Sequence, residues 1–95
     1  MVSLVISFGM VRIDDIVARM RRNPKDVRFN ELCRVCEQYF GEARQKRSSH
    51  RVYRTPWQGD PRVNIQNDKG SAKPYQVKQV LRAIERLEAD HGTQE

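Results

Sequence analysis

The chain has no run of about 20 apolar residues, the length that crosses a bilayer as a helix. It also has only two cysteines, Cys33 and Cys36, too few for the disulfide framework of a small secreted domain. Prolines number four, and a composition of 38% hydrophobic and 32% charged residues favours a folded chain over a disordered one. We therefore expect a single soluble domain with a small core, located in the cytoplasm and not bound to a membrane.

Acidic residues are outnumbered, with 12 Asp and Glu against 18 Lys and Arg and a net charge of +6. Residues 1–43 carry seven bases and six acids, whereas residues 44–95 carry eleven and six. No acid interrupts the five bases Arg44, Lys46, Arg47, Arg51 and Arg54. Such a stretch suits a polyanion, so a nucleic acid is the leading partner. From charge alone, a solvated basic face without a ligand is an equal alternative.

The first ten residues, Met1 to Met10, are apolar, but they lack a basic start and a small-residue cleavage site. We therefore expect that they are not a signal peptide. An edge strand, a segment buried against a neighbour, and translation that begins at Met10 are three alternatives. We divide the chain into an N-terminal extension of residues 1–26, a domain of residues 27–90 and a tail of residues 91–95.

Two segments near the ends of the chain have the apolar spacing of amphipathic helices. Residues 12–22 combine that spacing with acids near the start and bases near the end, and Pro24 stops the helix. Pro74 suits the first turn of a last helix, because its missing N–H has no partner there in any case. The buried stripe of this helix reads Val77, Val80, Leu81, Ile84 and Leu87. We expect the chain to fray after Ala89.

A third helix is predicted from Phe29, with Gly41 as its stop signal. Cys33 and Cys36 both fall within its apolar stripe. The C-x-x-C spacing is compatible with a metal or redox site, but the chain has only two histidines to complete a zinc site. Core packing is therefore the favoured interpretation of both cysteines.

Between residues 42 and 66 the apolar period shortens to two, which predicts three short antiparallel strands. The first ends at residues 47–49, the turn over residues 56–61 joins the second to the third, and residues 67–73 form a loop. The fold class is therefore α+β: a three-stranded antiparallel sheet with helices on one face, plus an extra N-terminal helix. Double-stranded-RNA-binding domains share this order of elements, and the uncovered face is left for a partner.

The stretch RQKRSSHRVYR, followed by RVNIQNDKGSAKPYQVKQVLRAI, resembles the HicA toxin family over roughly residues 29–89. In that family a Gly-Ser-His-His-aliphatic-aromatic stretch opens the second strand, a Val-x-Ile strand follows, and a Lys-Pro loop enters the last helix. The matching segments here are residues 48–53, 63–65 and 73–74. The chain departs from the pattern at Ser48, where the family has glycine, and at Arg51, where it has a second histidine.

The resemblance implies an endoribonuclease that cleaves mRNA and belongs to a type II toxin–antitoxin pair, held inactive by a HicB-type antitoxin. The first histidine of the family motif is catalytic, and it corresponds to His50. Ser48 puts the geometry of the turn in doubt, because glycine alone adopts a positive φ freely. Arg51 removes one acid–base partner and adds a cation that can bind phosphate.

Read from the residues themselves, His50 lies among cations that favour its neutral form. A neutral imidazole can take the proton of a ribose 2′-OH, so that the oxygen attacks the adjacent phosphorus. Lys46, Arg47 and Arg51 are the candidates for stabilising the charge on the phosphoryl oxygens. This mechanism needs no metal and no cofactor, and it leaves the leaving-group acid unassigned, because His91 lies in the tail.

The alternation of side chains along the second strand conflicts with an accessible His50. If Val52 faces the helices, His50 on the same strand faces them too. We therefore expect His50 at the lip of the turn. The alternative role for His50 is a strand-start histidine that only binds phosphate or caps the sheet.

Further candidates surround this segment. The full set expected to bind RNA is Arg44, Lys46, Arg47, Ser49, Arg51, Arg54, Lys69 and Lys73. The two lysines flank the loop before the last helix and can equally be ordinary solvated residues. Trp57 either anchors its turn or stacks on a base or the antitoxin, and Tyr53 and Tyr75 present the same choice. The alternative to an enzyme is a non-catalytic module of the same fold that binds RNA or an antitoxin.

Overall fold

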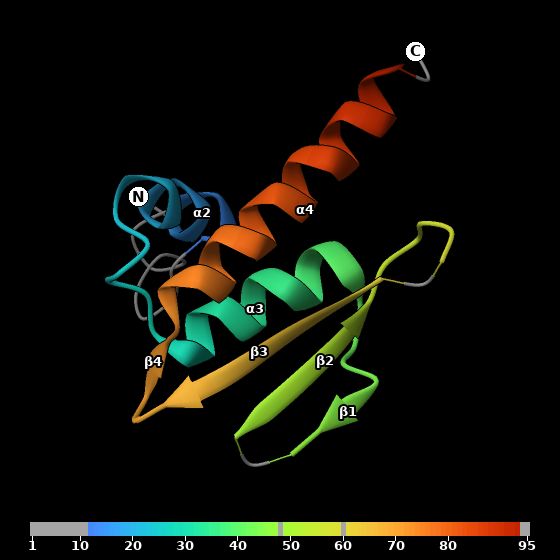
Figure 1. Cartoon of the computed structure of the whole chain (residues 1–95). Helices are drawn as coiled ribbons and strands as arrows, with labels where there is room; N and C mark the ends of the chain where they lie inside the picture. Colours follow the sequence, from blue (N-terminus) through green and yellow to red (C-terminus); the bar gives the residue numbers. More distant parts are fainter. Residues whose placement is uncertain (1–11, 48, 60, 94–95) are drawn as a thin grey trace, which may run out of the picture.

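The computed structural model describes residues 12–47, 49–59 and 61–93, and over these ranges it contains three helices and four strands (Figure 1). The elements are α2 (Ile13–Arg22), α3 (Phe29–Phe40), β1 (Gln45–Lys46), β2 (His50–Arg54), β3 (Arg62–Asp68), β4 (Ser71–Ala72) and α4 (Pro74–Thr93). The α+β class is confirmed. The prediction about Met1 to Met10 lies outside the described residues.

Helix α2 forms where the apolar spacing predicted it. Its buried side is made by Ile16, Val17 and Met20, and the helix ends at Asn23, directly before Pro24. Acids in its first turn and bases in its last turn complement the helix dipole. The amphipathic helix expected in the N-terminal extension is therefore present, and its apolar side is part of the core.

Helix α3 begins with a capping interaction and ends at a glycine. The side chain of Glu31 accepts the backbone N–H of Arg28 at 3.1 Å, which satisfies one of the N–H groups left free at a helix start. The guanidinium of Arg19 donates to the same carboxylate, so an ion pair links α2 to α3. Gly41 has a φ of +85°, the conformation that glycine adopts most readily.

The four strands form one antiparallel sheet in the order β1-β2-β3-β4, which is the predicted meander. The longest pairing joins β2 to β3, from His50 opposite Gln66 to Arg54 opposite Arg62. On the other side of β2, Lys46 of β1 lies opposite Arg51. The β1–β2 turn and the β3–β4 turn therefore lie at one end of the sheet, and the β2–β3 loop at the other (Figure 1).

The fourth strand was not predicted, and the expectation of a loop over residues 67–73 was wrong in this respect. Strand β4 pairs back onto β3 through a two-residue turn in which Lys69 and Gly70 have φ of +54° and +90°. Two positive φ values match a type I′ turn, whose twist suits a hairpin. The side chain of Asn67 accepts the backbone N–H of Gly70 at 2.6 Å and holds the turn closed.

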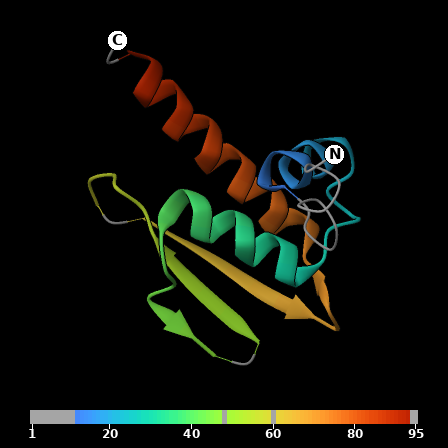
Figure 2. The same cartoon turned by 180° about the vertical axis from the view of Figure 1, so that it is seen from behind.

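Helices α3 and α4 pack on one face of the sheet, and α2 packs against both helices from outside (Figures 1 and 2). The largest fully buried side chains between these layers are Tyr53, Ile16, Met20, Leu32, Ile65, Ile84, Val35, Val77, Val80 and Cys36. Within the described residues no helix covers the opposite face. We call that face the open face, defined by His50, Val52 and Arg54 and their β3 partners.

The expectation that Val52 faces the helices was wrong. Tyr53 is fully buried in the core, whereas Val52 is half-buried and faces away from the helices. The larger aromatic residue occupies the core position because it buries more apolar surface. His50 lies two residues before Val52 on the strand, so its side chain points to the same side as that of Val52, the open face. The conflict stated above therefore does not arise.

Helix α4 is longer than expected. The sequence predicts fraying after Ala89, but the helix continues to Thr93. Its buried residues include Val77, Val80 and Ile84, as the apolar stripe predicts. Within the described residues no helix is long and apolar enough to cross a membrane.

Candidate active site around His50

His50 is the first residue of β2, and its half-buried imidazole lies on the open face. Both ring nitrogens have neighbours within hydrogen-bond distance. Nδ1 lies 3.1 Å from Oγ of Ser49, and Nε2 lies 2.6 Å from Nε2 of Gln66, the residue directly opposite on β3. The ring is therefore held from both sides while one edge of the site stays accessible.

A second glutamine connects this pair to α4. Gln76 is only 5% exposed, and its Oε1 accepts the backbone N–H of Gln66 at 2.8 Å. Its Nε2 donates to Oε1 of Gln66 at 3.4 Å and to the hydroxyl of Tyr75 at 3.3 Å. Because β4 is only two residues long, Gln76 supplies the acceptor that a longer fourth strand would give to this backbone N–H.

These contacts determine the direction of each hydrogen bond. Oε1 of Gln76 accepts a backbone N–H, so the Nε2 end of its amide must point at Oε1 of Gln66. The amide of Gln66 then presents its own Nε2 to His50, and this NH₂ can only donate. Nε2 of His50 is therefore the acceptor, and in the neutral ring the proton is on Nδ1 and is shared with Ser49.

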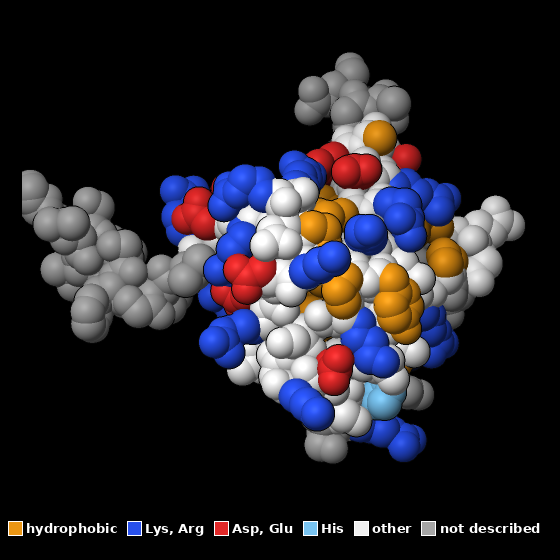
Figure 3. All heavy atoms as spheres, turned by 60° about the vertical axis from the view of Figure 1, so that its left-hand side comes forward, with side chains coloured by type: hydrophobic (Ala, Val, Ile, Leu, Met, Phe, Trp, Pro, Cys, Tyr) orange, Lys and Arg blue, Asp and Glu red, His pale blue; other side chains and the backbone are white. Residues whose placement is uncertain are grey.

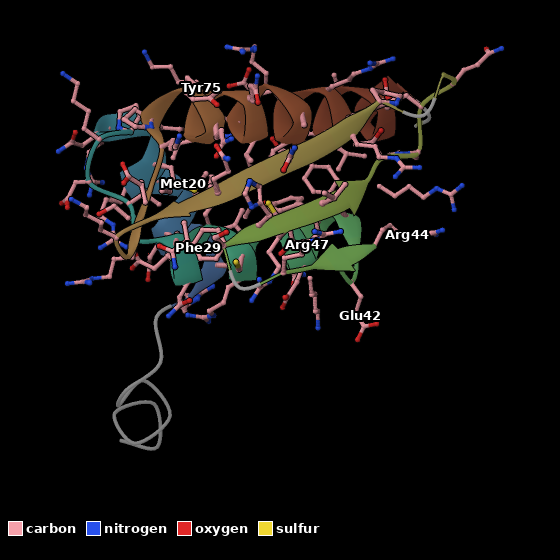
Figure 4. The ribbon with its side chains drawn as sticks, turned by 60° about the horizontal axis from the view of Figure 1, so that its bottom comes forward. Met20, Phe29, Glu42, Arg44, Arg47 and Tyr75 are labelled. Atoms are coloured by element: carbon pink, nitrogen blue, oxygen red, sulfur yellow. The ribbon has the colours of Figure 1, made fainter. Side chains whose placement is uncertain are left out.

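Three of the seven predicted cations, Lys46, Arg47 and Lys69, lie exposed at the same end of the sheet as His50. The backbones of Arg47 and His50 exchange hydrogen bonds of 2.9 and 3.3 Å across the β1–β2 turn. Arg44 lies before β1, where its backbone N–H donates to the carbonyl of Val52, whereas Arg47 lies in the turn beside His50 (Figure 4). Lys46 and Ser49 are also exposed there, and Lys69 projects from the neighbouring β3–β4 turn. Ser48, the first departure from the family motif, lies outside the described residues.

Two other predicted contacts occupy more distant positions. Arg54 lies at the far end of β2, opposite Arg62, and is not close to the imidazole along the strand. Lys73 precedes α4, and its carbonyl accepts the backbone N–H groups of Gln76 and Val77, so the backbone here starts the helix. The loop expected around the two lysines is instead a tight hairpin that leads into α4.

Arg51 is not brought together with the imidazole. Its side chain lies on the helix side of the sheet, with the guanidinium carbon 5.6 Å from the centre of the Phe29 ring. Its Nη1 donates to the carbonyl of Arg47 and, at 3.3 Å, to that of His50. Arg51 therefore holds the β1–β2 turn in shape, a different role from the phosphate contact that the sequence predicts.

The remaining candidates make contacts within the fold. Cys33 and Cys36 are buried in the core as predicted, and burial raises the pKa of both thiols, that of Cys36 well above its ordinary value. Trp57 donates its indole N–H to Asp90 at 2.8 Å and lies under the guanidinium of Arg86, at 4.2 Å. These contacts anchor the β2–β3 loop to α4, which supports the interpretation of Trp57 as a turn anchor.

Sequence reasoning missed Gln66 and Gln76. A signal for Gln66 was present, because the predicted hairpin places it on the same strand face as Asn64, among the polar positions. Gln76 is a polar residue four positions before Val80 on the apolar side of α4, which is where a buried amide with a defined partner is expected. The link between them depends on the unpredicted β4.

Comparisons of the chain with protein-family models, with curated proteins and with solved structures found no match in any of the three. Within the described residues, no group of three or more His, Cys, Asp and Glu side chains is arranged to hold a metal ion. The function of the site is therefore proposed from the chemistry of these residues together with the resemblance described above.

Proposed function

We propose that this protein is an RNA-cleaving toxin of the HicA type, with a fold like that of double-stranded-RNA-binding domains. Its substrate is mRNA, and its inhibitor is a HicB-type antitoxin that covers the open face. The observation that carries the proposal is the position of His50. An imidazole with an acceptor nitrogen lies on an uncovered face, at the end of the sheet where exposed cations gather.

In this mechanism a ribose 2′-OH replaces the amide of Gln66 at Nε2 of His50. The exchange leaves the hydrogen bonding of Nε2 satisfied, because one donor takes the place of another at the same lone pair. Nε2 then accepts the hydroxyl proton, the 2′ oxygen forms a bond to phosphorus, and the bond to the 5′ oxygen breaks. The group that protonates this leaving oxygen is unassigned.

Stabilisation of the phosphoryl oxygens falls to the exposed cations. Arg47 is joined to His50 through the backbone of the turn, and Lys46 precedes it on β1. Arg51 is omitted from this role because its guanidinium lies against Phe29. Cations that approach the charge that develops in the transition state lower the barrier more than cations that only bind the ground state.

The test is cleavage of a labelled mRNA by the purified protein in the presence and absence of EDTA. We expect cleavage with both, and products that end in a 2′,3′-cyclic phosphate, because the attacking oxygen belongs to the substrate. Abolition by the chelator, with restoration by an added divalent ion, would contradict the mechanism. A parent protein that leaves RNA intact under all conditions would contradict the activity itself.

One observation favours a second candidate, a non-catalytic module of the same fold that binds RNA or the antitoxin. Both ring nitrogens of His50 already have protein partners, Ser49 and Gln66, as in a structural histidine. This candidate predicts salt-sensitive RNA binding or tight antitoxin binding without new RNA ends. The same cleavage experiment separates the two functions.

A further inference from the structure

A cavity of about 300 Å³ lies at the other end of the sheet, between the β2–β3 loop and the middle of α4. Its lining includes Trp57 and Arg62 from the hairpin and Gln79, Arg82 and Arg86 from α4. A cavity of this size is at the lower limit of small-molecule sites in proteins, about 300–1,000 Å³. None of the residues assigned to the His50 site contributes to it.

The described residues that line this cavity include three arginines and no acid. Within the described part of the chain Arg82 makes no ion pair, so its charge is available to a ligand. Guanidinium groups bind the oxygens of phosphate through paired N–H donors. The charge of the cavity therefore selects an anion.

Part of the cavity wall is apolar and is held in place by contacts within the fold. Val63 and Ala83 give aliphatic surface, and Trp57 gives an aromatic ring held by its hydrogen bond to Asp90 and by the guanidinium of Arg86 over the ring. The hydroxyl of Thr55 donates to the carbonyl of Pro61 and ties the two ends of the loop together. A preformed site that combines flat apolar surface with guanidinium groups suits a nucleotide better than an acidic side chain, which has no ring to fill it.

The cavity and the candidate active site are connected along α4, because Gln76 contacts Gln66 beside His50 and Gln79, about one turn further along the helix, lines the cavity. Thr55 directly follows β2 and lies five residues after His50, so about 16 Å separate the two sites along the strand at 3.3 Å per residue. Val63 and Thr55 of the cavity lie on the helix side of the sheet and His50 lies on the open face, so a strand that reaches both sites passes around the edge of β3. In the space-filling view, Lys and Arg side chains lie between exposed hydrophobic ones over the visible face (Figure 3).

We propose that this cavity is a second RNA subsite, which holds one nucleotide of the strand that is cleaved at His50. The phosphate contacts Arg82 and Arg62, and the base or sugar lies against the apolar wall beside Trp57. The inference rests on the proposed function and adds to it a length requirement: RNA must extend a few nucleotides from the cleaved bond to gain the additional affinity.

The experiment measures affinity for single-stranded RNA of two lengths over a range of KCl, using the full chain with His50→Ala so that RNA stays intact. Arg82→Gln is the test variant. Arg22→Gln is its control, because it removes an equally exposed arginine on α2 that does not line the cavity. We expect Arg82→Gln to weaken binding of a ten-nucleotide RNA several-fold and to reduce the salt slope by about 0.7, the value for one phosphate contact on a single strand.

The same substitution should leave binding of a two-nucleotide RNA unchanged, because that ligand is too short to span both sites. Equal slopes for Arg82→Gln and Arg22→Gln on the long RNA would overturn the subsite, even if the parent protein cleaves RNA. Loss of binding to poly-glutamate, with RNA binding unchanged, would overturn it in favour of an acidic protein partner. Failure of the parent to cleave RNA would instead refute the proposed function.

Discussion

His50 and Gln66 lie directly opposite each other on β2 and β3, and their side chains meet with Nε2 to Nε2 at 2.6 Å. The register of the hairpin creates this contact, and Gln76 determines which end of the Gln66 amide takes part. A buried glutamine at the start of α4 therefore selects the tautomer of a histidine on the sheet. The backbone N–H of Gln66, two residues before the end of β3, fixes the orientation of the Gln76 amide. Through the Gln66 side chain, this orientation leaves Nε2 of His50 as the acceptor that a general base requires.

The first prediction concerns this link. Replacing Gln76 with leucine leaves the backbone N–H of Gln66 without its acceptor and frees the Gln66 amide to rotate. We expect a loss of about 1–3 kcal/mol in the free energy of unfolding, the usual cost of an unpaired buried polar group. We also expect a mixture of His50 tautomers and slower cleavage, with the tautomers measured from the imidazole ¹⁵N shifts by NMR.

Gln38→Leu is the matched control, because it makes the same change at an exposed position of α3. It should alter neither the ¹⁵N shifts nor the cleavage rate. If Gln76→Leu retains a single Nδ1–H tautomer and the parent rate, the link has no part in positioning His50. Loss of stability alone would indicate a purely structural glutamine.

The second prediction separates two neighbouring arginines that the sequence treats alike. Arg47 is exposed beside the site, whereas Arg51 lies against Phe29 and bonds to two carbonyls of the β1–β2 turn. Arg47→Gln should reduce RNA affinity and the salt slope without changing the melting temperature. Arg51→Gln should lower the melting temperature by a few degrees, because about 1 kcal/mol shifts a domain of this size by about 4–8 °C.

Salt-dependent binding and thermal melting of both variants check this division. Equal salt slopes for Arg47→Gln and the parent would remove Arg47 from the RNA contacts. An unchanged melting temperature for Arg51→Gln would show that its contacts with Phe29 and the turn are energetically neutral.

The third prediction concerns alkaline pH. Burial raises the pKa of Cys36 in the folded state, so the folded chain keeps this thiol proton at a pH where the unfolded chain has released it. The corresponding stability is complete below about pH 8.5, the ordinary value for cysteine, and is lost as the pH rises above it. The slope approaches about 1.4 kcal/mol per pH unit for each such group.

Chemical denaturation between pH 7 and 10.5 measures this slope for the parent and for Cys36→Ala. The variant should be less stable at pH 7 and should lose stability less steeply, although Cys33 and Tyr53 still contribute, since burial raises their pKa values in the same direction. Val35→Ala is the control, because it also removes side-chain volume at a fully buried position but takes away no titrating group. If all three proteins have parallel pH profiles, Cys36 is not the source of the alkaline loss.

The helices and the meander could be predicted because their signals are local. The stripe of Ile16, Val17 and Met20 has the helical period, and Pro24 and Gly41 mark the ends of helices in the sequence. The candidate histidine and its basic turn were also visible. All these features depend on residues that are close together along the chain.

The rest depends on contacts between distant segments. Alternation alone does not reveal that Tyr53, and not Val52, faces the helices, because both residues are apolar. The turn that leads into β4 places Lys69 at a positive φ, which is uncommon for any residue but glycine. Gln66 and Gln76 meet only after that turn brings α4 to the edge of β3. The sequence thus predicted the histidine of the site but not the two glutamines that position its ring.

The most direct test of the central claim is induction of the parent protein and of His50→Ala in cells without the antitoxin, with mRNA ends mapped before and after. The account predicts growth arrest and new mRNA ends with the parent, and neither with a His50→Ala protein that folds and accumulates to the same level. Intact mRNA with both proteins, or the same new ends with both, would contradict it.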